Sequence, residues 1–342
     1  MSETSVKPKQ VALPSDFPAR TIVFPDPISR LIYGIFGIQA RVAEAGQKLA
    51  SEFKALLSSA NAPGGVEHLK YVDPQGSECD VFLTFWSDAE RHKRWFAQPA
   101  VCAWWRALPI TGEVGVWREV MNCSKDYYQF GGGGDRKGGI GVLGELAPTD
   151  KFGYWGGYRD RVPASTTDKF RSPLIDVPDP TTGDTLGRRL SVDAPDNICF
   201  IREAQAWDTA GPEERKIWME SMEPVVDRWV TMLRDKPQET GCLSMRHCAE
   251  LDVKSGTVLE RQSQIVFLLS LKHIERAARS THTHLAVKKT YTEMYTEPKF
   301  KPQMHAWVEM LIAKKGELET EYVNCHPMTG LLPYFESREV DI

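Results

Sequence analysis

The sequence has little of what marks a membrane or secreted protein. None of its apolar runs approaches the ~20 residues that a membrane helix needs. The first eight residues, Met-Ser-Glu-Thr-Ser-Val-Lys-Pro, lack the basic start and apolar block of a secretory signal. We therefore expect a cytoplasmic protein that does not bind membranes.

Excess positive charge is missing as well. The chain has 42 Lys and Arg residues against 46 Asp and Glu residues, which gives a formal net charge of −4. Surfaces that bind nucleic acid usually carry a basic patch, whereas the two signs are interspersed here. We expect no nucleic-acid partner.

Paired cysteines and zinc-binding spacings are also absent. The seven cysteines are an odd number and include no Cys-x-x-Cys pair. No His-x-x-x-His spacing occurs either. In a chain of this length, such a pattern favours reduced, buried thiols over a disulfide framework.

What the sequence does contain is ordinary globular composition and two similar series of elements. Of its 342 residues, 42% are hydrophobic and 26% are charged, which is enough for a sizeable core. After an N-terminal arm (1–20), apolar periodicity predicts the order βαββαβ within 21–122. The predicted strands are 30–39, 66–72, 80–86 and 115–120, and the predicted helices are 41–59 and 88–107, the second capped by Ser87 and Asp88.

The same order recurs in residues 195–335. The predicted strands are 197–207, 242–251, 264–270, 307–313 and 321–324, and the predicted helices are 212–234 and 272–295. Residues 82–87 and 266–271 match in pattern, and each opens a charged helix, which indicates an internal duplication. We predict an α+β fold in which two ferredoxin-like units form a dimeric α+β barrel-like core within one chain. Residues 123–194 would be connecting loops, and 336–342 a tail.

Residues 139–144 match the dinucleotide fingerprint Gly-x-Gly-x-x-Gly. That fingerprint requires a strand before it and a helix after it. Here glycines 131–134 precede it and Pro148 soon follows, so the match is a weak indication of nucleotide binding.

Two histidines, His282 and His284, lie in the predicted helix 272–295. Residues i and i+2 of a helix point about 200° apart, so at most one of the two can bind a given metal. An inward-facing histidine is more often a satisfied core residue than a ligand. The residues alone therefore leave the function open.

A set of short sequence motifs narrows the possible functions. They are Tyr154-Trp155-Gly156-Gly157-Tyr158-Arg159-Asp160-Arg161-Val162-Pro163, the stretch from Pro195 to Trp207, Thr240-Gly241-Cys242, His282-Thr283-His284-Leu285-Ala286, and the stretch from Tyr322 to Leu332. In order and spacing, from about residue 20 to 335, the chain resembles the aldoxime dehydratases, a family of b-type haem lyases that tend to form homodimers.

The resemblance implies haem b, ferrous in the active state, with His284 as the axial ligand to iron. Because no Cys-x-x-Cys-His motif occurs, the haem would be held non-covalently. Arg161 matches a distal arginine, whose fork of donors suits an oxime oxygen or a haem propionate. The alternative for Arg161 is structural pairing with Asp160. His326 would have a structural role or face a propionate, and loops within 123–194 would contribute to the pocket.

Two positions depart from the family. Glu203 stands where its best-known members have a serine that binds the oxime hydroxyl, and Val308 stands in place of a catalytic histidine. Glu203 is the leading substitute, because a desolvated carboxyl stays protonated at neutral pH. His305 is the other candidate acid. It would share a face with Val308 in a helix but not in a strand, and we predict a strand.

The implied reaction is loss of water from an alkyl or arylalkyl aldoxime to give the nitrile. A haem enzyme acting on another N–O or N–N substrate, and a haem-binding or sensing protein without turnover, remain alternatives.

Overall fold

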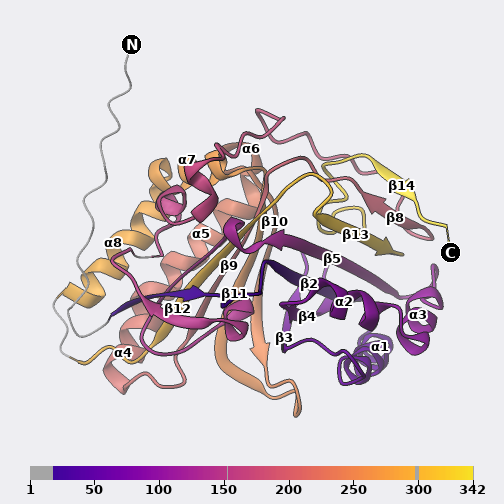
Figure 1. Cartoon of the computed structure of the whole chain (residues 1–342), viewed down its shortest axis with the longest axis horizontal. Helices are drawn as coiled ribbons and strands as arrows, with labels where there is room; N and C mark the ends of the chain where they lie inside the picture. Colours follow the sequence, from indigo (N-terminus) through magenta and orange to yellow (C-terminus); the bar gives the residue numbers. More distant parts are fainter. Residues whose placement is uncertain (1–17, 152, 297–299, 342) are drawn as a thin grey trace.

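The computed structural model describes residues 18–151, 153–296 and 300–341, and most of the predicted arm lies outside them. Figure 1 shows a curved sheet with helices on its outer sides. In the described residues the sheet has 14 strands, in the order β14-β8-β13-β5-β2-β4-β3-β10-β11-β9-β12-β6-β1-β7. The fold is therefore mixed α and β, as predicted.

The first half follows the predicted order of elements closely. It comprises β2 (Arg30–Ala40), α1 (Ala43–Leu56), β3 (Gly65–Val72), β4 (Glu78–Trp86), α2 (Ala89–Phe96), α3 (Pro99–Arg106) and β5 (Val114–Ser124). The carboxylate of Asp88 caps α2 by accepting from the N–H groups of Glu90 and Arg91. The single helix predicted over 88–107 is wrong, because Pro99 opens a second helix there.

The second half repeats this order. It comprises β9 (Ile198–Ala206), α4 (Pro212–Ile217), a π-helical turn η5 (Trp218–Met222), α5 (Glu223–Asp235), α6 (Pro237–Thr240), β10 (Cys242–Leu251), β11 (Val258–Leu268), α7 (Leu271–Ser280), α8 (His282–Thr296) and β12 (His305–Ala313). Its strand order, β10-β11-β9-β12, corresponds to β3-β4-β2-β5. The helix predicted over 272–295 is two helices, because Thr281 is extended, with ψ of 132°.

The connecting segment 123–194 is more ordered than a set of loops. It supplies β6 (Tyr128–Gly133), β7 (Glu145–Pro148), β8 (Arg189–Val192) and four short 3₁₀ helices, η1 (Lys125–Tyr127), η2 (Gly139–Leu143), η3 (Trp155–Asp160) and η4 (Pro163–Thr166). Strand β6 pairs with β12 on one side and with β1 (Ala19–Val23) on the other. Strand β6 thereby pairs with backbone N–H and C=O groups that β12 would otherwise leave exposed at an open sheet edge.

The last strands close the opposite end of the sheet. β13 (Leu318–Val323), which we predicted as part of the second unit, pairs with β5 of the first half. The predicted tail contains β14 (Ser337–Glu339), which pairs with β8. Edge pairing between distant segments leaves no local pattern in a sequence, so these contacts were missed.

The core lies where the inner faces of the two halves meet. Buried apolar side chains from β2, β4, β9 and β11 form one cluster, and the ring of Tyr33 lies 4.8 Å from that of Phe200. Separate apolar clusters fill the space beneath the helices of each half. All seven cysteines are free and six are buried, which agrees with the prediction of reduced thiols.

A charged cluster also lies in this core, around the guanidinium of Arg202. The side chain is fully buried and pairs with Glu250 at 2.8 Å, with Glu67 of β3, and with Glu309 of β12 at 3.8 Å. Burial raises the pKa of Glu309 to about 7. The cluster joins strands from both halves.

The Gly-rich segment 139–144 contributes to this cluster. Its η2 turn donates the N–H of Ile140 to Glu309 at 3.1 Å and the N–H of Gly139 to Glu67 at 3.3 Å. Gly139 has φ of +56°, which favours glycine. The backbone donors of this glycine motif therefore bind the protein's own carboxylates.

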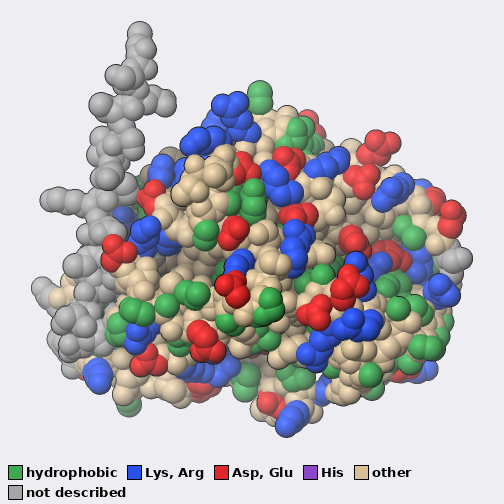
Figure 2. All heavy atoms as spheres, in the orientation of Figure 1, with side chains coloured by type: hydrophobic (Ala, Val, Ile, Leu, Met, Phe, Trp, Pro, Cys, Tyr) green, Lys and Arg blue, Asp and Glu red, His purple; other side chains and the backbone are tan. Residues whose placement is uncertain are grey.

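Charges of both signs are interspersed on the face shown in Figure 2. Within the described ranges, no helix is long and apolar enough to cross a bilayer.

We expect Arg202→Met to destabilise the protein by about 3–5 kcal/mol, because it leaves buried carboxylates without a counter-charge. Urea unfolding of the haem-free protein measures this change. As a control, Lys93→Met removes an exposed ion pair with Glu90 and should leave the unfolding midpoint almost unchanged. A loss below about 1 kcal/mol for Arg202→Met would contradict the role given to the cluster.

Candidate haem site

The site is built around His284 in the first turn of α8. Its ring is 4% exposed, and burial lowers its pKa to about 4, so the imidazole is neutral at physiological pH. Nδ1 hydrogen-bonds the carbonyl of Ala278 at 2.9 Å. A neutral ring that donates from Nδ1 presents the lone pair of Nε2, and that nitrogen has no hydrogen-bond partner among the described residues.

The break between α7 and α8 makes this geometry available. In one continuous helix, the Ala278 carbonyl would accept the N–H of residue 282. Extended Thr281 ends α7 and redirects the chain, so the carbonyl instead accepts from the side chain of His284. The neighbouring His282 is exposed, as expected if only one of the two histidines is a ligand.

Aromatic side chains surround the His284 ring. The ring centroids of Trp229, Tyr154 and Trp155 lie 4.8, 5.6 and 5.9 Å from it. Three walls of this kind suit a flat apolar macrocycle. No group of three or more His, Cys, Asp and Glu side chains able to hold a metal occurs in the described residues, whereas a haem iron needs only one axial side chain. The residues present therefore fit haem.

Arg161 follows the η3 turn that also carries Trp155. Burial lowers the pKa of its guanidinium to about 10, so it remains charged at neutral pH. One nitrogen donates to the carbonyl of Tyr154 at 2.9 Å and to Gln129 at 3.3 Å, whereas Nε is buried without a partner. Among the described residues Arg161 forms no ion pair with Asp160, and its unpartnered Nε–H is available to a ligand.

Glu203 and Val308, the two positions that depart from the family, are direct cross-strand neighbours on β9 and β12. Both face the helices, because Ile201 and Val308 belong to the apolar cluster that contains Trp155. Burial raises the pKa of Glu203 to about 7, although the neighbouring side chains of Trp155 and Gln205 oppose this rise. The sequence left the direction of Glu203 open, and the fold turns it toward the His284 side of the sheet.

His305 lies elsewhere. It is the first residue of β12, and strand alternation places it on the face opposite Val308. Its ring stacks on Trp307, with centroids 4.7 Å apart, and Nδ1 hydrogen-bonds the carbonyl of Gly133. The structure thus does not bring His305 to the pocket, and we remove it from the candidate catalytic residues.

His326 is also far from α8. It follows β13, a strand that Figure 1 shows on the other side of the sheet from α7 and α8. Its Nδ1 accepts the N–H of Met328, and its own N–H donates to Gln39 of β2. These contacts shape a turn on the first half, so the structure does not support the prediction that His326 binds the cofactor.

Sequence reasoning did not identify Gln129, which contacts Arg161, or Trp229 and Tyr154, whose rings lie against His284. Gln129 lies on β6, inside the segment that was read as loops. Tyr154 and Trp155 stood in the phrase used for the resemblance, and aromatic residues next to Gly156-Gly157 were the signal that could have singled them out.

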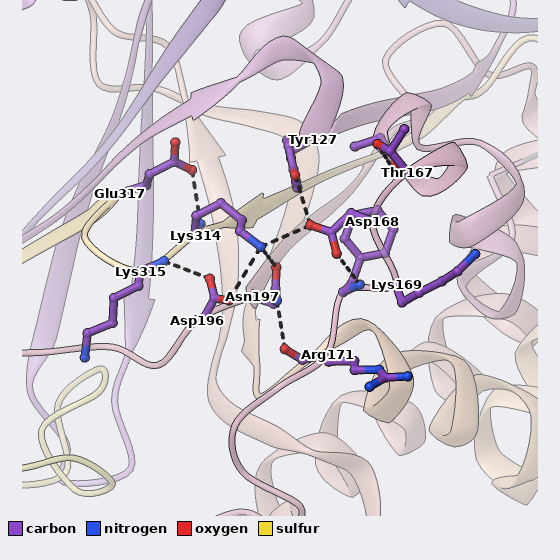
Figure 3. A network of polar contacts seen from close by, with 12 residues as sticks. Tyr127, Thr167, Asp168, Lys169, Arg171, Asp196, Asn197, Lys314, Lys315 and Glu317 are labelled. Atoms are coloured by element: carbon purple, nitrogen blue, oxygen red, sulfur yellow. Dashed lines mark hydrogen bonds and ion pairs between the residues drawn. The ribbon is translucent and has the colours of Figure 1, made fainter.

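A second polar region fixes the end of the connecting segment. Figure 3 shows the ammonium of Lys314 between Asp168, Asn197 and Asp196, at 3.0, 2.9 and 3.5 Å. Tyr127 also donates to Asp168, at 2.9 Å. An open groove of about 690 Å³ borders this network, but none of the predicted site residues lines it. We regard the network as structural.

Comparison with known proteins identifies a family of haem-containing enzymes. The family model described as haem-containing dehydratase matches residues 34–331. Phenylacetaldoxime dehydratase of Bacillus sp. (strain OxB-1) is 32% identical over 326 residues, which cover 94% of this chain and 93% of that protein. An aliphatic aldoxime dehydratase of Pseudomonas chlororaphis is 28% identical and covers 89% of this chain and 87% of its own length.

Solved structures are similar too. A crystal structure of an aldoxime dehydratase superposes with a TM-score of 0.84 at 26% identity, covering 96% of this chain and 93% of that one. An aldoxime dehydratase co-crystallised with butyraldoxime gives the same TM-score at 25% identity, covering 92% and 89% of the two chains.

We expect His284→Ala to lose the Soret band of the purified protein, because it removes the neutral imidazole whose Nε2 is left free to bind iron. His282→Ala changes an exposed histidine two residues away and should keep the band. Absorption spectra of both variants, taken after identical haem loading, decide the assignment. A normal Soret band and unchanged haem retention in His284→Ala would refute it.

Proposed function

The chain belongs to the haem-containing dehydratase family, and we propose that it removes water from an alkyl or arylalkyl aldoxime to give the nitrile. One observation carries this proposal. The neutral His284 ring lies against Tyr154 and Trp155, Arg161 donates to the carbonyl of Tyr154, and the protonatable Glu203 interacts with Trp155, so all three side chains meet the same aromatic pair. His284 would hold the haem, which in the ferrous state would supply an electron-rich iron able to bind the oxime nitrogen.

Glu203 is the proposed proton donor. A pKa near 7 leaves about half of these carboxyl groups protonated at neutral pH, which is suited to a general acid. The proton passes to the leaving hydroxyl as the N–O bond breaks, and the resulting carboxylate accepts the carbon-bound proton. Water leaves, the nitrile forms, and Glu203 regains its proton.

Arg161 is proposed to orient the oxime oxygen. Its guanidinium is charged, and its orphaned Nε–H is a donor without a partner in the described structure. Leaving such a buried donor unsatisfied costs free energy, so a ligand oxygen there is favoured.

The surroundings of Glu203 support an apolar substrate side chain. Val308 replaces a polar residue of the family directly beside it, and Ile201, on the same face of β9, belongs with Val308 to an apolar cluster. The relative from Bacillus sp. is named for phenylacetaldoxime, an arylalkyl aldoxime.

The remaining parts of the proposal concern architecture and assembly. We propose that the two βαββαβ segments are ferredoxin-like units sharing one barrel-like core, which their equivalent strand orders and common inner cluster support. On the family resemblance we also propose a cytoplasmic homodimer, which light scattering and cell fractionation would test.

The central experiment is product analysis with dithionite-reduced, haem-loaded protein and phenylacetaldoxime. Phenylacetonitrile is the expected product. Glu203→Gln should lower the rate by about 10²–10⁴-fold, because the amide cannot donate the proton. The wild-type rate should fall as pH rises above 7, as the carboxyl group becomes deprotonated. An unchanged rate in Glu203→Gln would remove it as the acid.

A paired variant supplies the control. Glu203→Ser and Val308→His, introduced together, place the family's serine and histidine at adjacent positions on β9 and β12. The double variant should recover activity that Glu203→Ser alone loses. Failure of the wild type on a panel of aldoximes, with a normal ferrous spectrum, would favour a different N–O substrate or a binding function.

A further inference from the structure

The carbonyl of Ala278 accepts two hydrogen bonds from side chains. One comes from Nδ1 of His284 at 2.9 Å, and the other comes from the hydroxyl of Tyr154 at 3.1 Å. Both donors reach it because Thr281 ends α7 and leaves the carbonyl outside the helical ladder. The proposed haem ligand therefore shares its anchor with a tyrosine from the connecting segment.

Tyr154 is held firmly in this position. Its ring lies 5.6 Å from the His284 ring, at 35°, and Lys288 of α8 places its ammonium 4.7 Å above the tyrosine ring. The backbone carbonyl of Tyr154 accepts from Arg161 at 2.9 Å. One residue thus contacts the ligand histidine by its side chain and the pocket arginine by its backbone.

Sharing an acceptor has a chemical consequence for the histidine. The hydrogen bond from Nδ1 sets how much electron density the imidazole donates through Nε2, since a stronger bond makes the ligand more basic. A carbonyl that already accepts from a phenol is a weaker acceptor for the imidazole. The Tyr154 hydroxyl therefore opposes the action of the Ala278 carbonyl on His284.

We propose that Tyr154 is a positioning residue that limits electron donation from His284 to the haem iron, by competing for the Ala278 carbonyl. This inference rests on the proposed role of His284. The competition weakens the iron–histidine bond and favours the ferrous state, which the proposed reaction uses. Axial-ligand hydrogen bonding is one of the means by which a protein tunes haem potential.

The test is Tyr154→Phe in the haem-loaded protein, because phenylalanine keeps the ring beside His284 and Lys288 and removes only the hydroxyl. Resonance Raman spectra of the ferrous protein should show the iron–histidine stretch shifted to higher wavenumber. The reduction potential should shift to a more negative value. If the hydroxyl has a purely structural role, the stretch will not rise together with a fall in the reduction potential.

Tyr127→Phe is the matched control. Tyr127 lies in the same connecting segment, and its hydroxyl donates to Asp168 at 2.9 Å, away from His284. Its removal should leave both the iron–histidine stretch and the potential at wild-type values.

A second variant tests the sign. Ring-fluorinated tyrosine at position 154 is a more acidic phenol and a stronger donor, so the stretch should move to lower wavenumber. This variant also serves if Tyr154→Phe retains too little haem to measure. An iron–histidine stretch that is the same in wild type, Tyr154→Phe and the fluorinated protein overturns the inference.

Failure of the His284 assignment gives a different result. If His284→Ala leaves the ferrous spectrum unchanged, His284 is not the ligand, and both proposals fall. If His284→Ala abolishes the stretch while the Tyr154 variants do not shift it, only the role of Tyr154 is refuted.

Discussion

The buried guanidinium of Arg202 is the interaction on which the arrangement of the pocket depends. It contacts carboxylates from β3, β10 and β12, so it connects the two halves of the sheet. Arg202 precedes Glu203, and Glu309 follows Val308. Because successive side chains of a strand point to opposite faces, ion pairing on the inner face fixes the register of the two pocket residues on the outer face. The charged cluster in the core and the residue pair of the proposed site, Glu203 and Val308, therefore lie on opposite faces of the same two strands.

The break at Thr281 complements that constraint from the helical side. An uninterrupted helix would have used the Ala278 carbonyl in its own ladder, and Nδ1 of His284 would have needed another acceptor. The extended residue frees a strong backbone acceptor at the place where His284, the proposed haem ligand, and Tyr154 can both reach it. The proposed haem site thus lies between the outer face of β9 and β12 and the break between α7 and α8.

Much of the fold could be predicted because each element carries its own period. The strand predicted over 197–207 corresponds to β9, and the helix predicted over 41–59 contains α1. The errors have physical causes as well. Pro99 and Thr281 interrupt helices whose apolar periodicity continues across the break, so the pattern alone indicated single helices. Strands β6, β8 and β14 are short and gain their stability from distant partners, which local composition does not reveal.

For the site, the sequence by itself determined which residue types were available: a histidine phrase, a pocket arginine, and a glutamate and valine in place of the family's polar pair. Only the tertiary structure decided their relations. Strand pairing made Glu203 and Val308 neighbours although 105 positions separate them in the sequence. Strand alternation turned His305 to the other face, and edge pairing of β13 with β5 left His326 on the first half. Side-chain chemistry is local to a residue, whereas direction and proximity are set by the packing of the whole sheet.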